Sequence, residues 1–232
     1  MFSGWAGFRG AWLRPLFARI RKIPREKARA LASALLLKAR VKSAAPLFAF
    51  LFLTFACRAS DLPQRVLAEV NLARTAPHEY AQLLTARMGS ASRDVAEAVR
   101  FLEKARPMPP LAFSPGLSGG AYLHVADQGP RGTCGHNGSG WGNSPWSRMS
   151  RYGQFVGYAG ENIFYGSRDA RGIVCSLIID SGVSGRGHRK NIFNANFGVA
   201  GVACGPHANY GAMCVMDFAS SYIERGNAIA GL

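Results

Sequence analysis

Four side chains in glycine-rich surroundings are the residues of this sequence most suited to chemistry. Two are imidazoles and two are carboxylates: His136 in CGHNGSG, Glu161 in AGENIFYG, and Asp180 and His188 in LIIDSGVSGRGHRKNI. Glycines separate Asp180 from His188, and glycine adopts turn conformations freely. That loop can therefore fold back and bring the imidazole near the carboxylate. We expect all four side chains to line one cavity.

The chemistry that these residue types favour is metal or ligand binding. Neutral imidazoles bind Zn²⁺ or Cu²⁺, and carboxylates add ligands or fix the imidazole tautomer. We predict His136 and His188 as the ligands of zinc or another divalent metal. With water at an open position the site could hydrolyse a substrate, with Glu161 and His188 as candidate catalytic residues. A catalytic zinc site usually has three firm protein ligands, so we favour binding without turnover. The remaining alternative is a buried polar network that locks loops.

Other catalytic signatures give no support to an enzyme. Ser139 in NGSGW and Ser184 in GVSGR lack the glycine spacing of a nucleophile elbow. A Ser–His–Glu arrangement could still form in space, because triad members need not be close in sequence. The sequence contains no Walker motif and no dinucleotide fingerprint. Enzymatic activity is left open, with a non-catalytic role favoured.

The net charge of +15 over 232 residues suggests nucleic-acid binding until its distribution is considered. Residues 1–42 hold eleven Lys or Arg and a single acid, Glu26. The remainder has seventeen basic and twelve acidic residues, a net charge of +5. It shows no basic stripe that could follow a phosphate backbone. We expect no nucleic-acid partner.

The N-terminal part is predicted to be a leader, residues 1–59. Its apolar run from Ser43 to Ala56 is too short to span a bilayer and has the length of a signal-peptide core. Cleavage after Ala59 would secrete the protein, whereas cleavage before Cys57 would allow a lipid anchor. We favour simple secretion, so the protein is expected to be secreted or periplasmic, with a lipoprotein as the alternative.

The basic segment before the apolar run is unusually long for a secretory signal. Translation from a GTG codon at Val41 would give an ordinary leader, so the true start is predicted near residue 41. A peptide from Met1–Arg40 in cell extract would contradict this hypothesis. A cytoplasmic basic tail before an anchor and an Arg-rich organelle-targeting segment are the alternatives.

Four cysteines follow the leader, and an even number in an exported chain indicates two disulfides with three possible pairings. We favour Cys204–Cys214, which would brace a hairpin. The other pair would be Cys134–Cys175, which would tie the His136 loop to the helix that ends at Asp180. A zinc knuckle is unexpected, because no two of them have its close spacing.

Periodicity and capping residues predict the elements that position these side chains. Helices are expected over five stretches: 61–74, from Pro77, 92–106, from Ser114–Pro115 to about Gln128, and from Ser167 or Asp169 to about Ile178. His124 falls on an apolar helix face and is interpreted as a core residue. His78 and His207 are expected at the surface. Arg186 and Arg189 are interpreted as a solvated loop or partners of Asp180, with pairing to an acidic ligand as the alternative.

Two strands, Phe197–Cys204 and Met213–Ala219, have apolar residues on both faces, which predicts that both faces are covered. Residues 129–157 are interpreted as a long loop, and 161–163 as a short extended segment. The resulting prediction is an α+β fold, a three-layer α-β-α sandwich with a central antiparallel sheet. It would form one domain over residues 60–225, with a tail at 226–232.

The motifs in this order resemble the CAP superfamily of cysteine-rich secretory, antigen 5 and pathogenesis-related 1 proteins, whose domain is also called SCP. The resemblance is strongest to the bacterial branch. It covers about 160 residues, from Asp61 to Tyr222, through VLAEVNLAR, GHNGS, SPWSRMSRYG, GENI, LIID, RGHRKNI, FGVAGVACG and CVMDFASSY.

The resemblance implies an α-β-α sandwich with a central cavity lined by two His and two acids, at His136, Glu161, Asp180 and His188. Leu177 stands where the family has a Trp, which implies a differently shaped wall. Members have been linked to sterol and lipid capture, to divalent metals and to proteolysis. We therefore expect an extracytoplasmic protein that binds a divalent metal, a small ligand, a lipid or an envelope component. The rivals are a metal-assisted hydrolase of peptides or envelope polymers and a structural module. Membrane contact would come only from the leader or a lipid anchor at Cys57.

Overall fold

The computed structural model describes residues 62–89 and 92–226. These residues belong to one structural unit. The predicted leader, the proposed start near residue 41 and both cleavage sites lie outside the described residues, as do residues 227–232. In the part of the chain that is described, no helix combines the length and apolarity needed to cross a membrane.

The chain alternates helices with strands. The helices are α2 (Leu62–Thr75), α3 (Pro77–Met88), α4 (Arg93–Lys104), α5 (Pro115–Arg131), α6 (Pro145–Met149), α7 (Ala170–Ile179) and α8 (Gly187–Ile192). The strands are β1 (Ala112–Phe113), β2 (Gly153–Tyr165), β3 (Val199–His207) and β4 (Gly211–Glu224).

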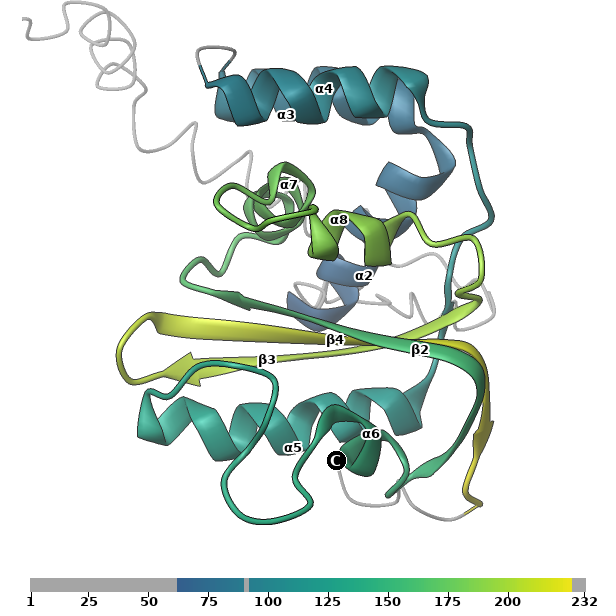
Figure 1. The fold of residues 1–232 in the computed structure, drawn as a ribbon, viewed down its shortest axis with the longest axis vertical. Helices are drawn as coiled ribbons and strands as arrows, with labels where there is room; N and C mark the ends of the chain where they lie inside the picture. The colour runs from purple at the N-terminus through teal and green to yellow at the C-terminus, as the bar shows by residue number, and fades with distance from the viewer. Residues whose placement is uncertain (1–61, 90–91, 227–232) are drawn as a thin grey trace, which may run out of the picture. The chain divides into compact units, whose positions relative to one another are not determined.

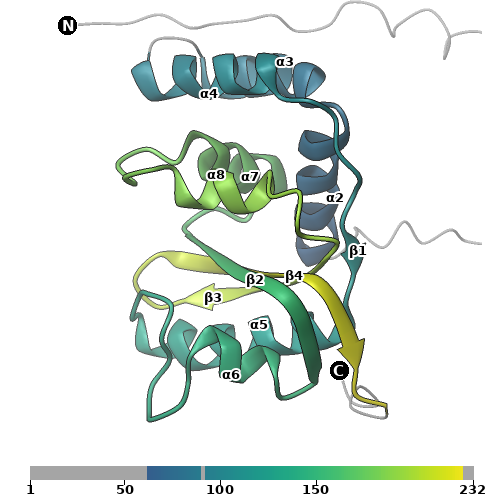
Figure 2. The ribbon, with the colours of Figure 1, turned by 45° about the vertical axis from the view of Figure 1, so that its right-hand side comes forward.

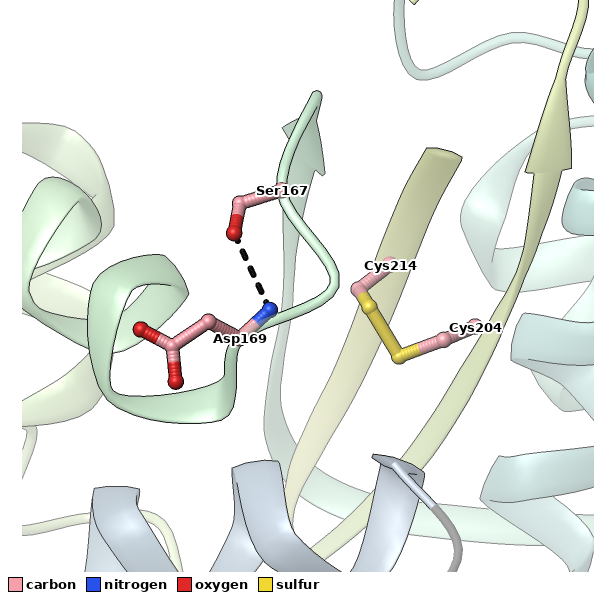
Figure 3. Close-up of a disulfide and its surroundings, with 4 residues drawn as sticks. All are labelled: Ser167, Asp169, Cys204 and Cys214. Carbon is pink, nitrogen blue, oxygen red and sulfur yellow. Dashed lines mark hydrogen bonds between the residues drawn. A yellow bond between two sulfur atoms is a disulfide. The ribbon is translucent and has the colours of Figure 1, made fainter. Parts of the chain in front are cut away.

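Local signals explain where several helices begin. The Ser114 side chain accepts a hydrogen bond from the Leu117 N–H and caps α5, whose first residue is Pro115. Of the two candidates for the cap of α7, Asp169 is the cap, because its carboxylate accepts from the Gly172 N–H. The Ser167 hydroxyl accepts in turn from the Asp169 N–H at 3.0 Å (Figure 3).

The strands form one sheet in the order β1-β3-β4-β2. β4 lies in the centre and pairs antiparallel with both β3 and β2, whereas the two-residue β1 adds a short parallel edge to β3. The predicted disulfide Cys204–Cys214 is confirmed and joins directly opposed residues of β3 and β4 (Figure 3).

Helices cover both faces of the sheet, which confirms the predicted α+β sandwich. α5 and α6 lie on one face, and α2, α7 and α8 lie on the other (Figures 1 and 2). α3 and α4 lie beyond α7 and α8, so this side of the sandwich is two helices deep. The largest apolar cluster joins α2, α3, α4 and α7 to the sheet, and smaller clusters fill the α5 face. At Gly201 the α5 backbone approaches β3 so closely that a Cβ would collide with it.

The region predicted as a long loop, residues 129–157, contains regular structure. α5 continues to Arg131 and ends at Gly132, whose φ of 67° suits a helix C-cap. Ser144 then caps the short α6 through the Ser147 N–H, and β2 begins at Gly153. The prediction of an unstructured 129–157 segment is therefore wrong, and the Ser-Pro pair at 144–145 was the available signal.

The second predicted disulfide, Cys134–Cys175, is also wrong. Cys175 lies buried on α7 with its thiol 3.8 Å from the Tyr80 hydroxyl. Cys134 is exposed in the loop that follows α5. Neither thiol forms a disulfide within the described residues.

Candidate functional site

Asp180 and His188 form the first of two His–acid pairs. The His188 Nδ1 lies 2.6 Å from the Asp180 Oδ1, and the His188 backbone N–H donates to Oδ2 at 2.9 Å. Asp180 caps the C-terminus of α7 in the left-handed conformation, with φ 53°. Gly182 and Gly185 also have positive φ and turn the loop back, as the glycine spacing indicated. His188 itself lies in the first turn of α8 rather than in the loop.

Two arginines fasten this loop to α4. Arg186 donates to the Asp180 carbonyl and to the Asp94 carboxylate, each at 2.6 Å. Arg189 is buried and donates to both carboxylate oxygens of Glu97 at 2.6 Å. Hydrogen bonds from Ser181 and Arg186 lower the pKa of Asp94. Both guanidinium groups are engaged within the protein, which leaves neither for an acidic ligand.

His136 and Glu161 form the second pair, with the His136 Nδ1 2.8 Å from the Glu161 Oε1. The Arg148 Nη2 donates to the other carboxylate oxygen at 2.6 Å and to the His136 carbonyl at 3.1 Å. The Arg148 and Glu161 side chains are each 1% exposed, whereas that of His136 is 53% exposed. A buried ion pair thus presents a largely exposed imidazole.

α5 holds the loop that carries His136. The His124 Nε2–H donates to the Gly135 carbonyl at 2.9 Å, and the Gln128 amide donates to the same oxygen at 2.8 Å. The Ser139 backbone N–H donates to Asp127 at 2.7 Å. Burial, and then the charge of Arg148, lower the pKa of His124. His124 is therefore a hydrogen-bonded core residue, as predicted.

β2 connects the two pairs through consecutive residues. The Glu161 side chain points to the α6 side of the sheet, where it meets Arg148. The Asn162 amide points to the α8 side and donates to the His188 carbonyl at 2.9 Å. In residues 62–89 and 92–226, no three His, Cys, Asp or Glu side chains gather closely enough to hold one metal ion. The metal role of His136 and His188 stays a prediction.

A cleft of about 390 Å³ opens beside the first pair. Asp180 and His188 contribute the acid and the imidazole, and Ser176 and Ser181 add hydroxyls. The other lining residues are Met88, Ile163, Phe164, Tyr165, Leu177, Ile179 and Tyr210. Leu177 is thus part of the wall. His136 does not line this cleft, but the hydroxyl of Tyr165 accepts from the Gly135 N–H at 3.0 Å and links its wall to the His136 loop.

Several buried polar residues of the structure were not identified from the sequence as site residues. Among them are Arg148, Arg74 and Asp217. Asp217 is directly opposite Glu161 in the register of β4 and β2. Burial, and then the negative charge of Glu161, raise the pKa of Asp217 well above its usual range. Asp217 could have been identified from the sequence, because it is the one acid in the otherwise apolar strand CVMDFA.

The prediction of a surface position for His207 is wrong, whereas His78 is exposed as expected. His207 is 2% exposed, and its Nε2–H donates to the Thr133 carbonyl at 2.9 Å. Its Nδ1 accepts from the backbone N–H groups of Asn209 and Tyr210. The imidazole therefore fills and hydrogen-bonds its own hairpin turn, which a turn-forming sequence alone does not reveal.

Comparisons with known proteins identify the family. The model of the cysteine-rich secretory protein family, CAP, matches residues 67–218. The chain therefore belongs to this family. No curated protein matches it.

Solved structures that are similar to it include two from bacteria. One is an extracellular protein containing a SCP domain from Bacillus anthracis, with 22% identity and a TM-score of 0.38 over 48% of this chain and 34% of that one. The chain thus spans about a third of the Bacillus protein's length. The other is an outer surface protein from Borrelia burgdorferi, with 16% identity and a TM-score of 0.41 over 61% of this chain and 92% of that one.

Proposed function

We propose that this protein is an exported binding module whose cleft beside His188 takes a small, largely apolar ligand that ends in a hydroxyl group. The observation that carries this proposal is the cleft itself, where apolar side chains surround one His–acid pair. Such a lining, with few convergent polar groups, is typical of small-molecule sites. Membership of a family described as secretory supports the export.

The pairing of His188 favours a hydroxyl over a carboxylate. In the neutral imidazole, Nδ1–H donates to Asp180, so Nε2 is left as an acceptor. An alcohol can donate a hydrogen bond to that nitrogen. A carboxylate would instead need a protonated ring, with Asp180 as a competing anion 2.6 Å away on its other side.

Binding of a fluorescent fatty alcohol, compared with the fatty acid of the same chain length, tests this proposal. We expect the mature protein to bind the alcohol more tightly at neutral pH. His188→Gln should weaken binding of the alcohol about fivefold, since one hydrogen bond contributes about 1 kcal/mol. Leu177→Trp should weaken both probes by filling the cleft. His78→Gln, at an exposed histidine outside the cleft, is the matched control.

Three results would overturn the proposal. Equal binding by the wild type, His188→Gln and Leu177→Trp would place the probes elsewhere on the protein. If neither probe binds, the alternative of a structural module, in which the polar residues only lock loops, would be favoured. Turnover of a peptide or envelope polymer that requires Zn²⁺ and is lost in His188→Gln would instead support the metal-assisted hydrolase.

A further inference from the structure

Behind the His136–Glu161 pair lies a buried cluster whose polar atoms are incompletely satisfied. Asp217 and Glu161 are opposed on β4 and β2, so both side chains leave the sheet on its α5–α6 face. Within the described residues, the Nε of Arg148 and the Nδ1 of His124 are buried without a hydrogen-bond partner, and no N–H group donates to either carboxyl oxygen of Asp217, whose only polar side-chain neighbour within hydrogen-bond reach is Glu161. Each such group costs about 1–3 kcal/mol. Several of them in one place suggest a conformational role.

The charged and titratable groups near Asp217 can be named element by element. β2 contributes Glu161, α6 contributes Arg148, and β4 itself contributes Tyr222. α5 presents backbone, since a Cβ on Gly120 would lie 3.2 Å from the Asp217 Oδ2. Its titratable residue in this layer, His124, interacts with Arg148 and Glu161. Arg148 is therefore the positive group available to Asp217.

Arg148 is at present committed to the His136 loop, residues 132–144. Its Nη1 donates to the Asn143 carbonyl at 2.9 Å, and its Nη2 donates to the His136 carbonyl and to Glu161. While Asp217 is neutral, the positive charge of Arg148 is balanced by the negative charge of Glu161. A second carboxylate in the same dry layer would be an uncompensated buried charge, which is strongly unfavourable.

We propose that Asp217 is a pH-sensitive latch for the His136 loop. While Asp217 keeps its proton, Arg148 binds the loop through His136 and Asn143. When Asp217 releases its proton to solvent, Arg148 turns its unpartnered Nε toward the new carboxylate. Its hydrogen bonds to the His136 and Asn143 carbonyls then break. The loop then opens and carries the exposed imidazole away from Glu161. This latch does not depend on the ligand proposed for the His188 cleft.

Hydrogen exchange of residues 132–144, followed from mildly acidic to alkaline pH, tests the latch. Comparison with Asp217→Asn at each pH removes the intrinsic pH dependence of exchange, because the amide has nearly the same shape and cannot ionise. With each unit rise in pH, the equilibrium constant for loop opening should increase by as much as about tenfold in the wild type relative to the variant. Asp127→Asn is the matched control: it weakens the bond to Ser139 directly, so it should loosen the loop at every pH and keep the wild-type slope.

Identical pH profiles for the wild type and Asp217→Asn would overturn the proposal. Infrared spectroscopy of the wild type provides a second test that needs no variant. At neutral pH the spectrum should contain the C=O stretch of a protonated carboxylic acid, which alkaline titration should remove in step with loop exchange. Absence of that band at neutral pH would show that Asp217 is already ionised, and the latch would be refuted.

Discussion

His188 and Asp180 are joined by two hydrogen bonds, one from the imidazole and one from the backbone N–H of the same histidine. The carboxylate therefore fixes both the ring and the start of α8. Asp180 reaches them because it leaves α7 in the left-handed conformation. The position of the His188 ring in the cleft thus depends on a backbone conformation that most residues disfavour.

Two substitutions of Asp180 should show how much of the protein's stability depends on its left-handed backbone conformation and how much on its charge. Asparagine tolerates the left-handed conformation, so Asp180→Asn should keep most of the stability and lose mainly the charge beside His188. Asp180→Ala should cost about 1–2 kcal/mol from conformational strain alone, besides the lost hydrogen bonds. Urea unfolding measures the difference. Equal unfolding free energies for the two variants would contradict this interpretation.

The stability of the protein should depend on pH through Asp217. Its pKa is raised in the folded state, so the folded protein keeps a proton that the unfolded chain releases. The stabilisation is complete below the unfolded-state pKa, near 3.9 for an ordinary Asp, and is lost as pH rises towards the folded-state value. Across this window the wild type should lose about 1.4 kcal/mol per pH unit relative to Asp217→Asn. Chemical denaturation of both proteins at several pH values checks the slope, and a constant difference would contradict it.

Arg74 should be among the residues that stabilise the fold most. It is 1% exposed and donates to the backbone carbonyls of Pro109, Ile192, Asn194 and Phe197. It thereby ties α2 to the chain between α8 and β3. Arg74→Ala would leave these carbonyls unpaired and should cost on the order of 3–5 kcal/mol. Thermal unfolding measures the loss. Arg65→Ala, at an exposed arginine of the same helix, should change stability little.

The two cysteines outside the Cys204–Cys214 bridge should react at very different rates. Cys134 is exposed, so iodoacetamide should modify it in the native protein. Cys175 is buried and burial raises the pKa of its thiol, so it should react only after unfolding. Peptide mass spectrometry with and without denaturant identifies the modified residues. A Cys134–Cys175 peptide in the non-reduced digest would contradict the structure.

Sequence reasoning worked best where local chemistry defines an element. Ser114 with Pro115, Pro77 and Asp169 begin helices because capping and a fixed φ act within one turn. Cys204 and Cys214 could be paired because hairpin strands bring residues close in sequence face to face. The glycines between Asp180 and His188 likewise indicated a loop that folds back.

Predictions from the sequence were wrong or missing where a residue's position depends on packing between segments that are distant in the chain. Nothing near Cys134 or Cys175 in the sequence reveals that the first is exposed and the second buried, with no bond between them. The first half of β2 has little strand character of its own and is ordered by pairing with residues 221–224 of β4. Arg148 and Asp217 look like ordinary charged residues until α6 and β4 bury them against Glu161. Their roles come mainly from Glu161, which lies more than ten residues from either of them in the chain.

Because successive side chains of β2 point to opposite faces of the sheet, this strand should tolerate insertions and deletions poorly. Glu161 serves one histidine and its neighbour Asn162 serves the other, on opposite faces of the same strand. A one-residue slip of β2 against β4 would exchange these faces, and each histidine would lose its hydrogen bond to β2 in a single step. An insertion or deletion anywhere between the β2 bulge at 156–159 and Glu161 should therefore be far less tolerated than one in the loops beside it.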